Sequence, residues 1–136
     1  MEGKAESVMI DTSAWIDAFQ EKTGWVAPLI RGLLDQDRAV TCGPVLFEIR
    51  RGLKPKERKR VLPLFEALRR LRFEESHWAL AGELDAVLRK DGKTLPAMDV
   101  LIAFLCLHHD ISILTMDEHF KFIPNLRVNT CRIAAP

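Results

Sequence analysis

The chain alternates between short apolar runs and longer segments in which apolar residues recur with helical spacing. Short apolar runs are typical of buried strands, and the helical spacing is typical of helices that bury one face. Because helices separate the strands, we expect parallel pairing in an α/β fold, with helices on both faces of a central sheet. Four to five short strands are predicted, at Val8–Ile10, Ala39–Cys42, Leu71–Glu74, Ile111–Leu114 and Leu126–Val128.

The helical segments carry apolar stripes that predict which face of each helix is buried. Asp11, Thr12 and Ser13 can cap the first helix. Its predicted inner face carries Trp15, Ile16 and Phe19. The clearest stripe lies within Ser76–Lys90 and consists of Leu80, Ala81, Leu84, Val87 and Leu88.

Two helical segments depart from a simple amphipathic pattern. Pro63 argues against one straight helix over Lys56–Arg72, because proline removes a backbone donor and its ring crowds the preceding turn. The segment Ala97–His109 is apolar almost all round, which predicts a buried helix. Further helices are predicted at Trp25–Asp37 and at Val45–Leu53, the latter after a Gly43-Pro44 break, with a helical turn at Asp117–Phe122.

Composition narrows the class of protein. The 136 residues suit a single domain over 1–136, and 48% hydrophobic residues exclude wholesale disorder. Cys42, Cys106 and Cys131 form no Cys-x-x-Cys pair, which argues against a disulfide scaffold or zinc ribbon and favours a reducing, cytoplasmic location. The longest apolar run, Val100–Leu107, is too short to span a membrane, and Met1–Ser7 shows no signal peptide.

Four carboxylates fall where the predicted fold would bring them together. Asp11 follows the first strand directly, and Asp117 follows the Ile111–Leu114 strand, so both should lie at the carboxyl edge of the sheet. Asp99 begins the buried helix, and Glu48 lies among apolar neighbours. Four such groups would repel one another, and a divalent cation would relieve the repulsion; carboxylate oxygens suit Mg²⁺ or Mn²⁺ rather than zinc.

Each acid also has a structural explanation. Asp11 could cap its helix, Asp99 could complement a helix dipole, and Asp117 could cap the turn that follows it. Glu48 has no evident capping role in mid-helix. Taken singly, the first three acids favour the structural explanation; taken together, at strand ends and at the start of a buried helix, they favour a metal site.

At these residues the chain resembles the PIN-domain nucleases, and within them the VapC toxins of toxin–antitoxin pairs. The resemblance runs over about residues 7–128, and its motifs in order are Met9–Ile16, Val45–Gly52, Met98–Ala103 and Ile113–Phe120.

The resemblance implies a PIN-like three-layer α/β/α sandwich, a homodimer, a VapB-type antitoxin as partner, and Mg²⁺- or Mn²⁺-dependent cleavage of RNA. It places the family's acidic quartet, as catalytic and metal-binding residues, on Asp11, Glu48, Asp99 and Asp117. The supporting hydroxyl positions fall on Thr12 or Ser13 and on Thr115. Several relatives carry a further acid where this chain has His119, which would lower the negative charge of the site and bears on a second metal.

The proposed chemistry is hydrolysis of RNA phosphodiester bonds by a metal-activated water, with Asp11, Asp99 and Asp117 on the first metal. Glu48 would help hold that metal or a second one, or orient the attacking water. By resemblance to the family, the expected products carry a 5′-phosphate and a 3′-hydroxyl.

A basic segment starts beside the proposed site. Residues 50–60 hold seven Lys or Arg and one acid, a net +6 inside a chain of net +1. Such a run is often only a solvated face. Beginning two residues after Glu48, Arg50, Arg51 and Lys54 are candidates to hold the RNA backbone, or to bind an acidic stretch of the antitoxin.

Two other functions stay open at this point. One is a catalytically weak PIN domain that serves as an RNA- or protein-binding module, against which the intact acidic quartet argues. The other is a metal-dependent nuclease that acts on DNA. Competition between RNA and DNA substrates would separate the second from an RNA-cutting toxin.

Overall fold

The protein is described by a computed structural model, which covers residues 6–130. Its centre is a five-stranded sheet in which every neighbouring pair of strands is parallel, in the order β3-β2-β1-β4-β5. The strands are short, as predicted. They span Val8–Ile10 (β1), Ala39–Cys42 (β2), Arg69–Leu71 (β3), Ser112–Thr115 (β4) and Val128–Thr130 (β5).

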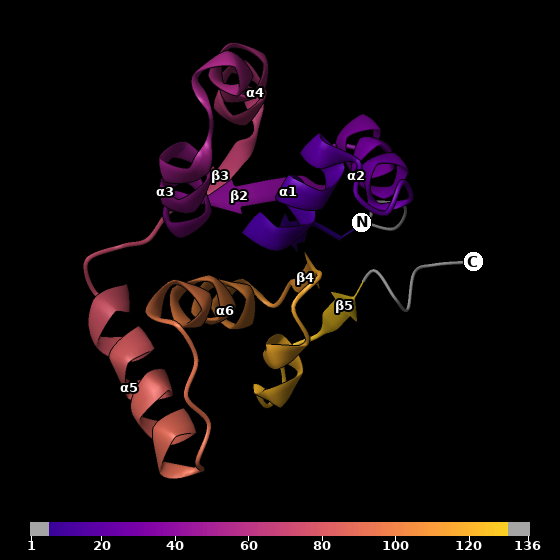
Figure 1. The fold of residues 1–136 in the computed structure, drawn as a ribbon. Coiled ribbons are helices and arrows are strands. Elements are labelled where there is room, and N and C mark those ends of the chain that lie inside the picture. Colours follow the sequence, from indigo (N-terminus) through magenta and orange to yellow (C-terminus); the bar gives the residue numbers. More distant parts are fainter. Residues whose placement is uncertain (1–5, 131–136) are drawn as a thin grey trace.

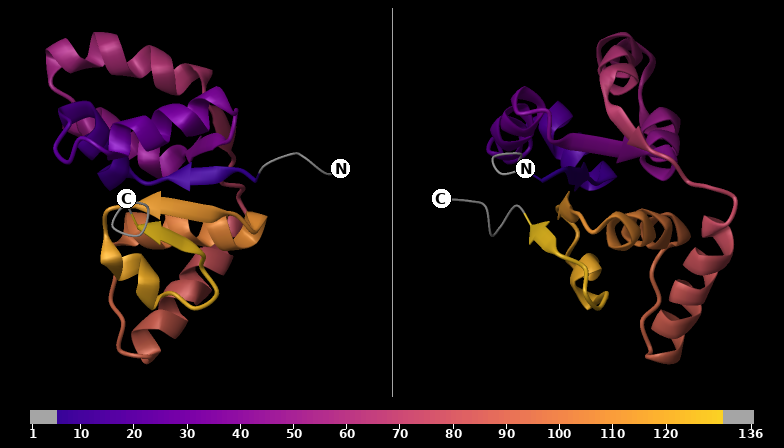
Figure 2. Two further views of the ribbon diagram at one scale, coloured as in Figure 1. Left: turned by 90° about the vertical axis from the view of Figure 1, so that its right-hand side faces the viewer. Right: turned by 180° about the vertical axis from the view of Figure 1, so that it is seen from behind.

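The strand order reverses beside β1. The chain moves outward from β1 to β2 and β3, then returns to the other side of β1 for β4 and β5. Parallel crossovers are right-handed, so the helices before and after this reversal cover opposite faces of the sheet. Figures 1 and 2 show α1–α4 on one side and α5 and α6 on the other, which confirms the predicted α/β/α layers.

The helices carry the side chains that meet at this reversal. They span Thr12–Gln20 (α1), Val26–Asp35 (α2), Gly43–Gly52 (α3), Pro55–Ala67 (α4), His77–Lys90 (α5) and Ala97–His109 (α6), with a 3₁₀ turn, η1, at Glu118–Phe122.

The core lies between the sheet and its helices. Met9, Ile10 and Ile113 of the central strands are fully buried, as an all-parallel sheet covered on both faces requires. On one face Trp15 of α1 packs against Phe65 of α4, with ring centroids 4.7 Å apart. On the other face α6 is buried through its middle, as its all-round apolar sequence predicts.

Several predicted boundaries and faces were wrong. The helix of residues 55–67 continues through Pro63, and Pro63 lies on its exposed face. Val61 and Phe65 of the same helix are buried in the core. Their burial compensates for the one hydrogen bond that proline cannot make. The α3 helix begins at Gly43 rather than Val45, with Pro44 in its first turn, where a missing N–H costs nothing.

The third strand begins two residues and ends three residues earlier than predicted, and the last strand lies two residues later. Both are edge strands. Arg69 and Arg70 are exposed, so the apolar signal that marks a buried strand is absent from β3.

Two apolar stripes are buried only in part. Trp15 is buried as predicted, but Ile16 is 37% exposed. On α5, Ala81 and Leu88 are buried, whereas Leu80 and Val87 are half-exposed. Since α5 packs against α6 at the periphery of the molecule, only part of its stripe finds a neighbour.

Candidate active site

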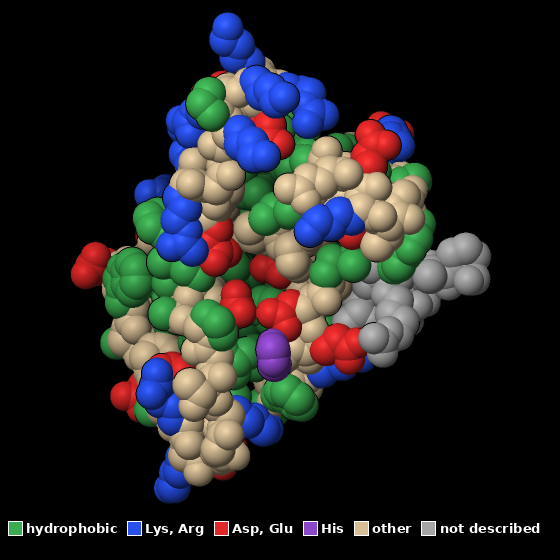
Figure 3. Space-filling view, in the orientation of Figure 1, with side chains coloured by type: hydrophobic (Ala, Val, Ile, Leu, Met, Phe, Trp, Pro, Cys, Tyr) green, Lys and Arg blue, Asp and Glu red, His purple; other side chains and the backbone are tan. Residues whose placement is uncertain are grey.

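The structure places all four predicted acids around the strand reversal. Asp11 follows β1, Asp117 follows β4, Asp99 is in the first turn of α6, and Glu48 lies on the mid-part of α3. Backbone pairing of β1 with β4 in register brings the ends of these two strands together. In Figure 3 red side chains gather in a hollow at the centre of this face, below the blue Lys and Arg side chains over α3 and α4.

Asp11 is the buried centre of the site, with only 3% of its surface exposed. It stands at the N-cap position of α1, but its side chain makes no capping hydrogen bond. Its Oδ2 instead accepts hydrogen bonds from Ser13 Oγ (2.7 Å) and Thr115 Oγ1 (2.8 Å). Burial raises the pKa of Asp11, and these hydroxyls offset part of the rise. The structure therefore does not support the alternative that Asp11 is only a cap.

The hydroxyls of Ser13 and Thr115 fix the two strand ends to each other. Their oxygens lie 3.2 Å apart. Ser13 Oγ accepts from the backbone N–H of Met116 (3.0 Å), and Thr115 Oγ1 accepts from that of Asp117 (2.9 Å). Met116 and Asp117, which form the start of the loop after β4 (the β4 loop), are thus connected to Asp11 through these two hydroxyls.

Thr12 makes the corresponding link to α3. Its Oγ1 donates to Glu48 Oε1 at 2.7 Å, and the other Glu48 oxygen lies 3.9 Å from the guanidinium of Arg51. All three predicted supporting hydroxyls, those of Thr12, Ser13 and Thr115, therefore contact an acid of the quartet.

Asp117 has two functions in the structure. Its Oδ1 accepts from the backbone N–H of His119 (2.9 Å), which caps the turn η1 as the structural explanation predicts. The same oxygen lies 2.7 Å from His119 Nδ1. His119 thus contacts the acidic site directly.

The charges of the four acids act on one another. Burial raises the pKa of Asp99 to about 7, and the charges of Asp11, Asp117 and Glu48 contribute to the rise. A carboxyl group with a pKa this high marks a place where negative charge is poorly compensated by the protein's own side chains.

The donor set fits a hard divalent cation. Every acid of the quartet offers carboxylate oxygens. A cation would favour the ionised form of Asp99, whose pKa is raised first by burial and then by the neighbouring negative charges. Among residues 6–130, no three or more Asp, Glu, His or Cys side chains are arranged in this structure so that they could hold a metal ion together. The other clustered ligand type, imidazole, lies elsewhere, at the end of α6 near His108.

Of the predicted RNA-binding residues, Arg51 has a printed contact with the quartet, through Glu48 (3.9 Å). Arg50 and Arg51 are exposed in the last turn of α3, and Lys54 directly precedes α4. Arg51 also lies over the ring of Phe47, 5.2 Å from its centroid. Sequence reasoning missed one cation near the site, Lys22, which lines a pocket with Ser13 and Met116. A single lysine between two helices has no pattern that could have revealed it.

The fold and the carboxylates define an α/β protein with an acidic site at its topological switch point. The sequence model of the PIN domain matches residues 8–126, so the chain belongs to the PIN-domain family.

Comparisons with individual proteins agree with this assignment. The chain is similar to the VapC ribonuclease Mb1587 of Mycobacterium bovis, at 28% identity over 124 residues that cover 88% of this chain and 92% of the relative. Ribonuclease VapC11 of Mycobacterium tuberculosis matches with the same identity and coverage.

Two solved structures share the fold. VapBC2 from Rickettsia felis, bound to a DNA fragment from its promoter, has a TM-score of 0.76 at 24% identity, covering 90% of this chain and 97% of that one. DNA-bound VapBC from Salmonella typhimurium has a TM-score of 0.75 at 22% identity, covering 93% and 98%.

Proposed function

We propose that this protein is a metal-dependent endoribonuclease that acts as the toxin of a toxin–antitoxin pair and is inhibited by a cognate VapB-type antitoxin. The observation that carries the proposal is the convergence of Asp11, Glu48 and Asp117 on Asp99, whose pKa they help to raise to about 7. Membership of the PIN-domain family and similarity to proteins named VapC ribonuclease support the same conclusion.

The quartet would hold Mg²⁺ or Mn²⁺. Asp11, Asp99 and Asp117 would be its ligands, directly or through water, and Glu48 would help to hold it or would orient the attacking water. When bound, the cation lowers the pKa of water and neutralises charge that develops on the phosphate. Ser13 and Thr115 keep Asp11 in place through hydrogen bonds to Oδ2, and Thr12 does the same for Glu48.

The substrate would be held by the basic rim, Arg50, Arg51 and Lys54. These cations would bind backbone phosphates without regard to base sequence. The same rim would bind an acidic stretch of the antitoxin, so that inhibitor and RNA compete for one surface.

The remaining parts of the proposal follow from the resemblance. We expect the protein to form a homodimer and to act in the cytoplasm, where RNA and antitoxin are found. None of the helices in residues 6–130 is long and apolar enough to cross a membrane.

The test is cleavage of RNA by the purified protein with Mg²⁺ or Mn²⁺. Asp11→Ala should abolish cleavage, because it removes a carboxylate at the centre of the site. The matched control is Asp35→Ala, which removes an exposed carboxylate at the end of α2 and should leave cleavage unchanged. Full activity of Asp11→Ala would overturn the site assignment.

The same assay separates the alternatives. Binding of RNA without metal-dependent turnover would favour the binding module. Preferential cleavage of DNA in a mixture of both substrates would favour a DNA nuclease.

A further inference from the structure

The loop between α1 and α2 is fixed to the molecule by a buried carboxylate. Asp17 is only 4% exposed, and its Oδ1 accepts hydrogen bonds from Thr23 Oγ1 (2.9 Å) and from the backbone N–H of Thr23 (3.4 Å). The backbone N–H of Lys22 donates to the carbonyl oxygen of Asp17 (3.1 Å). Glu21, with φ of 51°, turns the chain out of α1 just before Lys22. The backbone position of Lys22 is therefore set by contacts on both sides of it.

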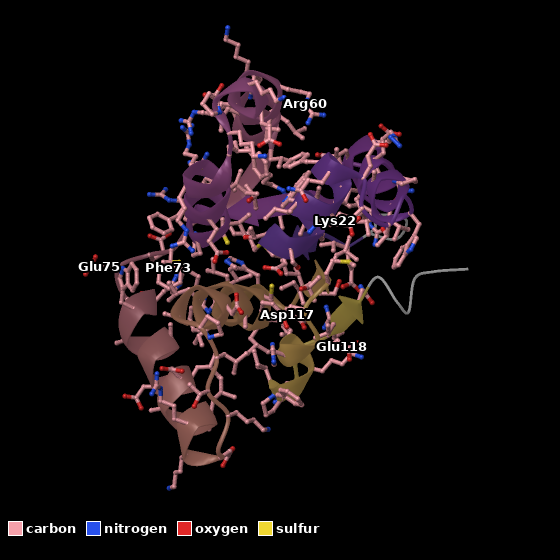
Figure 4. The ribbon with its side chains drawn as sticks, in the orientation of Figure 1. Lys22, Arg60, Phe73, Glu75, Asp117 and Glu118 are labelled. Carbon is pink, nitrogen blue, oxygen red and sulfur yellow. The ribbon has the colours of Figure 1, made fainter. Side chains whose placement is uncertain are left out.

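This loop places Lys22 at a pocket that borders the acidic site. The pocket measures about 310 Å³, and its lining includes Lys22, Ser13 and Met116. Ser13 is the residue whose hydroxyl donates to Asp11, so the pocket and the carboxylates share a wall. Figure 4 shows the labelled Lys22 beside α1 and Asp117 below it.

The Lys22 ammonium has no compensating partner within residues 6–130, where neither a hydrogen bond nor an ion pair involves it. Arg51 differs, because its guanidinium already lies near Glu48 and over the ring of Phe47. A free ammonium at the mouth of a pocket can bind an anionic ligand without first breaking an internal ion pair.

Lys22 and the basic rim lie on different flanks of the site. Thr12 is bonded to Glu48 on α3, the helix that carries Arg50 and Arg51. Its neighbour Ser13 is bonded to the β4 loop at Met116, the flank on which the pocket opens. A polyanion bound to the rim alone would be held on only one side of the carboxylates, which repel it.

We propose that Lys22 binds an RNA phosphate on the β4 flank, so that the strand crosses the carboxylates between two cationic anchors. Asp17 and Thr23 are positioning residues, which act through Lys22. The pocket beside Lys22 would receive the nucleotide adjoining that phosphate. This inference rests on the proposed function and adds the path of the substrate.

The first experiment measures binding of a fluorescein-labelled single-stranded RNA in EDTA, by anisotropy over a series of salt concentrations. Lys22→Ala should weaken binding about fivefold to tenfold, and the slope of log affinity against log salt should fall by about 0.7, the contribution of one phosphate contact. Lys22→Arg keeps the charge and should keep most of the affinity. The control is Lys90→Ala, an exposed lysine at the far end of α5 (Figure 1).

A second measurement uses cleavage with Mg²⁺. Lys22→Ala should raise KM while kcat stays close to that of the wild type, because the lysine holds the strand and does not contact the reacting atoms. If the wild type cuts RNA but Lys22→Ala has an unchanged KM and salt slope, this inference is wrong and the proposed function stands. If the wild type neither binds nor cuts RNA, both are wrong.

The positioning role has its own test. Thr23→Ala should weaken RNA binding less than Lys22→Ala, and Thr23→Ser should restore it by returning the hydroxyl to Asp17. In the Lys22→Ala background, Thr23→Ala should have no further effect on RNA affinity, because residues that act through one group are not additive. Additive losses would overturn the role given to Thr23.

Discussion

Ionisable side chains gather at both ends of α6, carboxylates around Asp99 in its first turn and imidazoles around His108 in its last turn. His77 packs against His108 with ring centroids 4.6 Å apart, and His108 against His109 at 5.1 Å. Burial and the neighbouring imidazoles lower the pKa of His109, which favours its neutral form. At the other end, burial and like charge raise the pKa of Asp99 to about 7.

The two clusters relieve their repulsion in different ways. An imidazole can lose its charge by releasing a proton and still form hydrogen bonds. His77 forms one here, in which its Nδ1 accepts from the backbone N–H of Glu74 (2.9 Å). Carboxylates become neutral only by taking up a proton, or they require a cation. The packing of the imidazole cluster therefore requires no further partner. The carboxylate cluster requires a cation or a proton to relieve its repulsion, and such a requirement is typical of a functional site.

The largest expected effect is that of Asp99→Asn. The rate of RNA cleavage by this variant should fall at least about a thousandfold, which corresponds to a rise of about 4 kcal/mol in activation free energy. The metal-free variant should be no less heat-stable than the wild type above neutral pH, since the amide keeps the shape and removes a repelled charge. Single-turnover cleavage and calorimetry measure the two effects, with Asp35→Asn as control. Cleavage within tenfold of the wild type would contradict the catalytic role.

His77→Ala should have the opposite effects to Asp99→Asn: it should lower stability and leave cleavage almost unchanged. Loss of a buried ring and of its hydrogen bond to Glu74 should lower the free energy of unfolding by about 2–3 kcal/mol. The kcat of the folded variant should stay within about twofold of the wild type. Urea unfolding measures the first and cleavage the second. His109→Ala, at an exposed position, is the matched control and should change stability little. A loss of kcat in His77→Ala would contradict the prediction and would mean that the two ends of α6 are coupled.

A smaller effect is expected in the dependence of stability on pH. The folded pKa of Asp99, about 7, lies above the ordinary aspartate value of 3.8. The folded state therefore binds more protons between these values, and the contribution of Asp99 to stability is lost as pH rises through about 7. His109 has a lowered pKa, so its contribution changes in the opposite sense and stability rises with pH.

The two trends can be separated by melting temperatures measured in EDTA from about pH 5 to about pH 8. Asp99→Asn should remove the decline with rising pH and leave the contribution of the imidazoles. Millimolar Mg²⁺ should also remove the decline in the wild type, because a bound cation favours the ionised carboxylate. An unchanged decline in Asp99→Asn would show that another group causes it.

The carboxylate cluster could be predicted from the sequence because its signal is topological. Asp11 and Asp117 each follow an apolar strand, and parallel strands bring such positions to one edge. That Asp117 also caps η1 was predicted as an alternative, and the structure shows both features in one side chain. The local sequence pattern and the fold agree at these positions, so short segments of sequence were enough to predict the acidic site.

The imidazole cluster and Lys22 could not be predicted in this way. His77 and His108 lie on different helices, and only the packing of α5 against α6 brings them together. Lys22 depends on hydrogen bonds from its loop to Asp17, which leave no periodic trace in the sequence. The prediction that the apolar stripe of α5 is buried was wrong in part for a related reason. Periodicity shows that Leu80 and Ala81 lie near one face of the helix, but it does not show how much of that face another element covers.

The smallest expected effect concerns His119, the one imidazole that contacts the carboxylates. Its Nδ1 lies 2.7 Å from Asp117 Oδ1, and its side chain is 68% exposed. Because exposed pairs contribute little, His119→Ala should change the affinity for Mg²⁺ by less than about 1 kcal/mol, in the direction of tighter binding as the oxygen is released. Titration calorimetry with Mg²⁺ measures the change. Weaker binding by His119→Ala would instead mean that His119 supports Asp117 as a metal ligand and is part of the site.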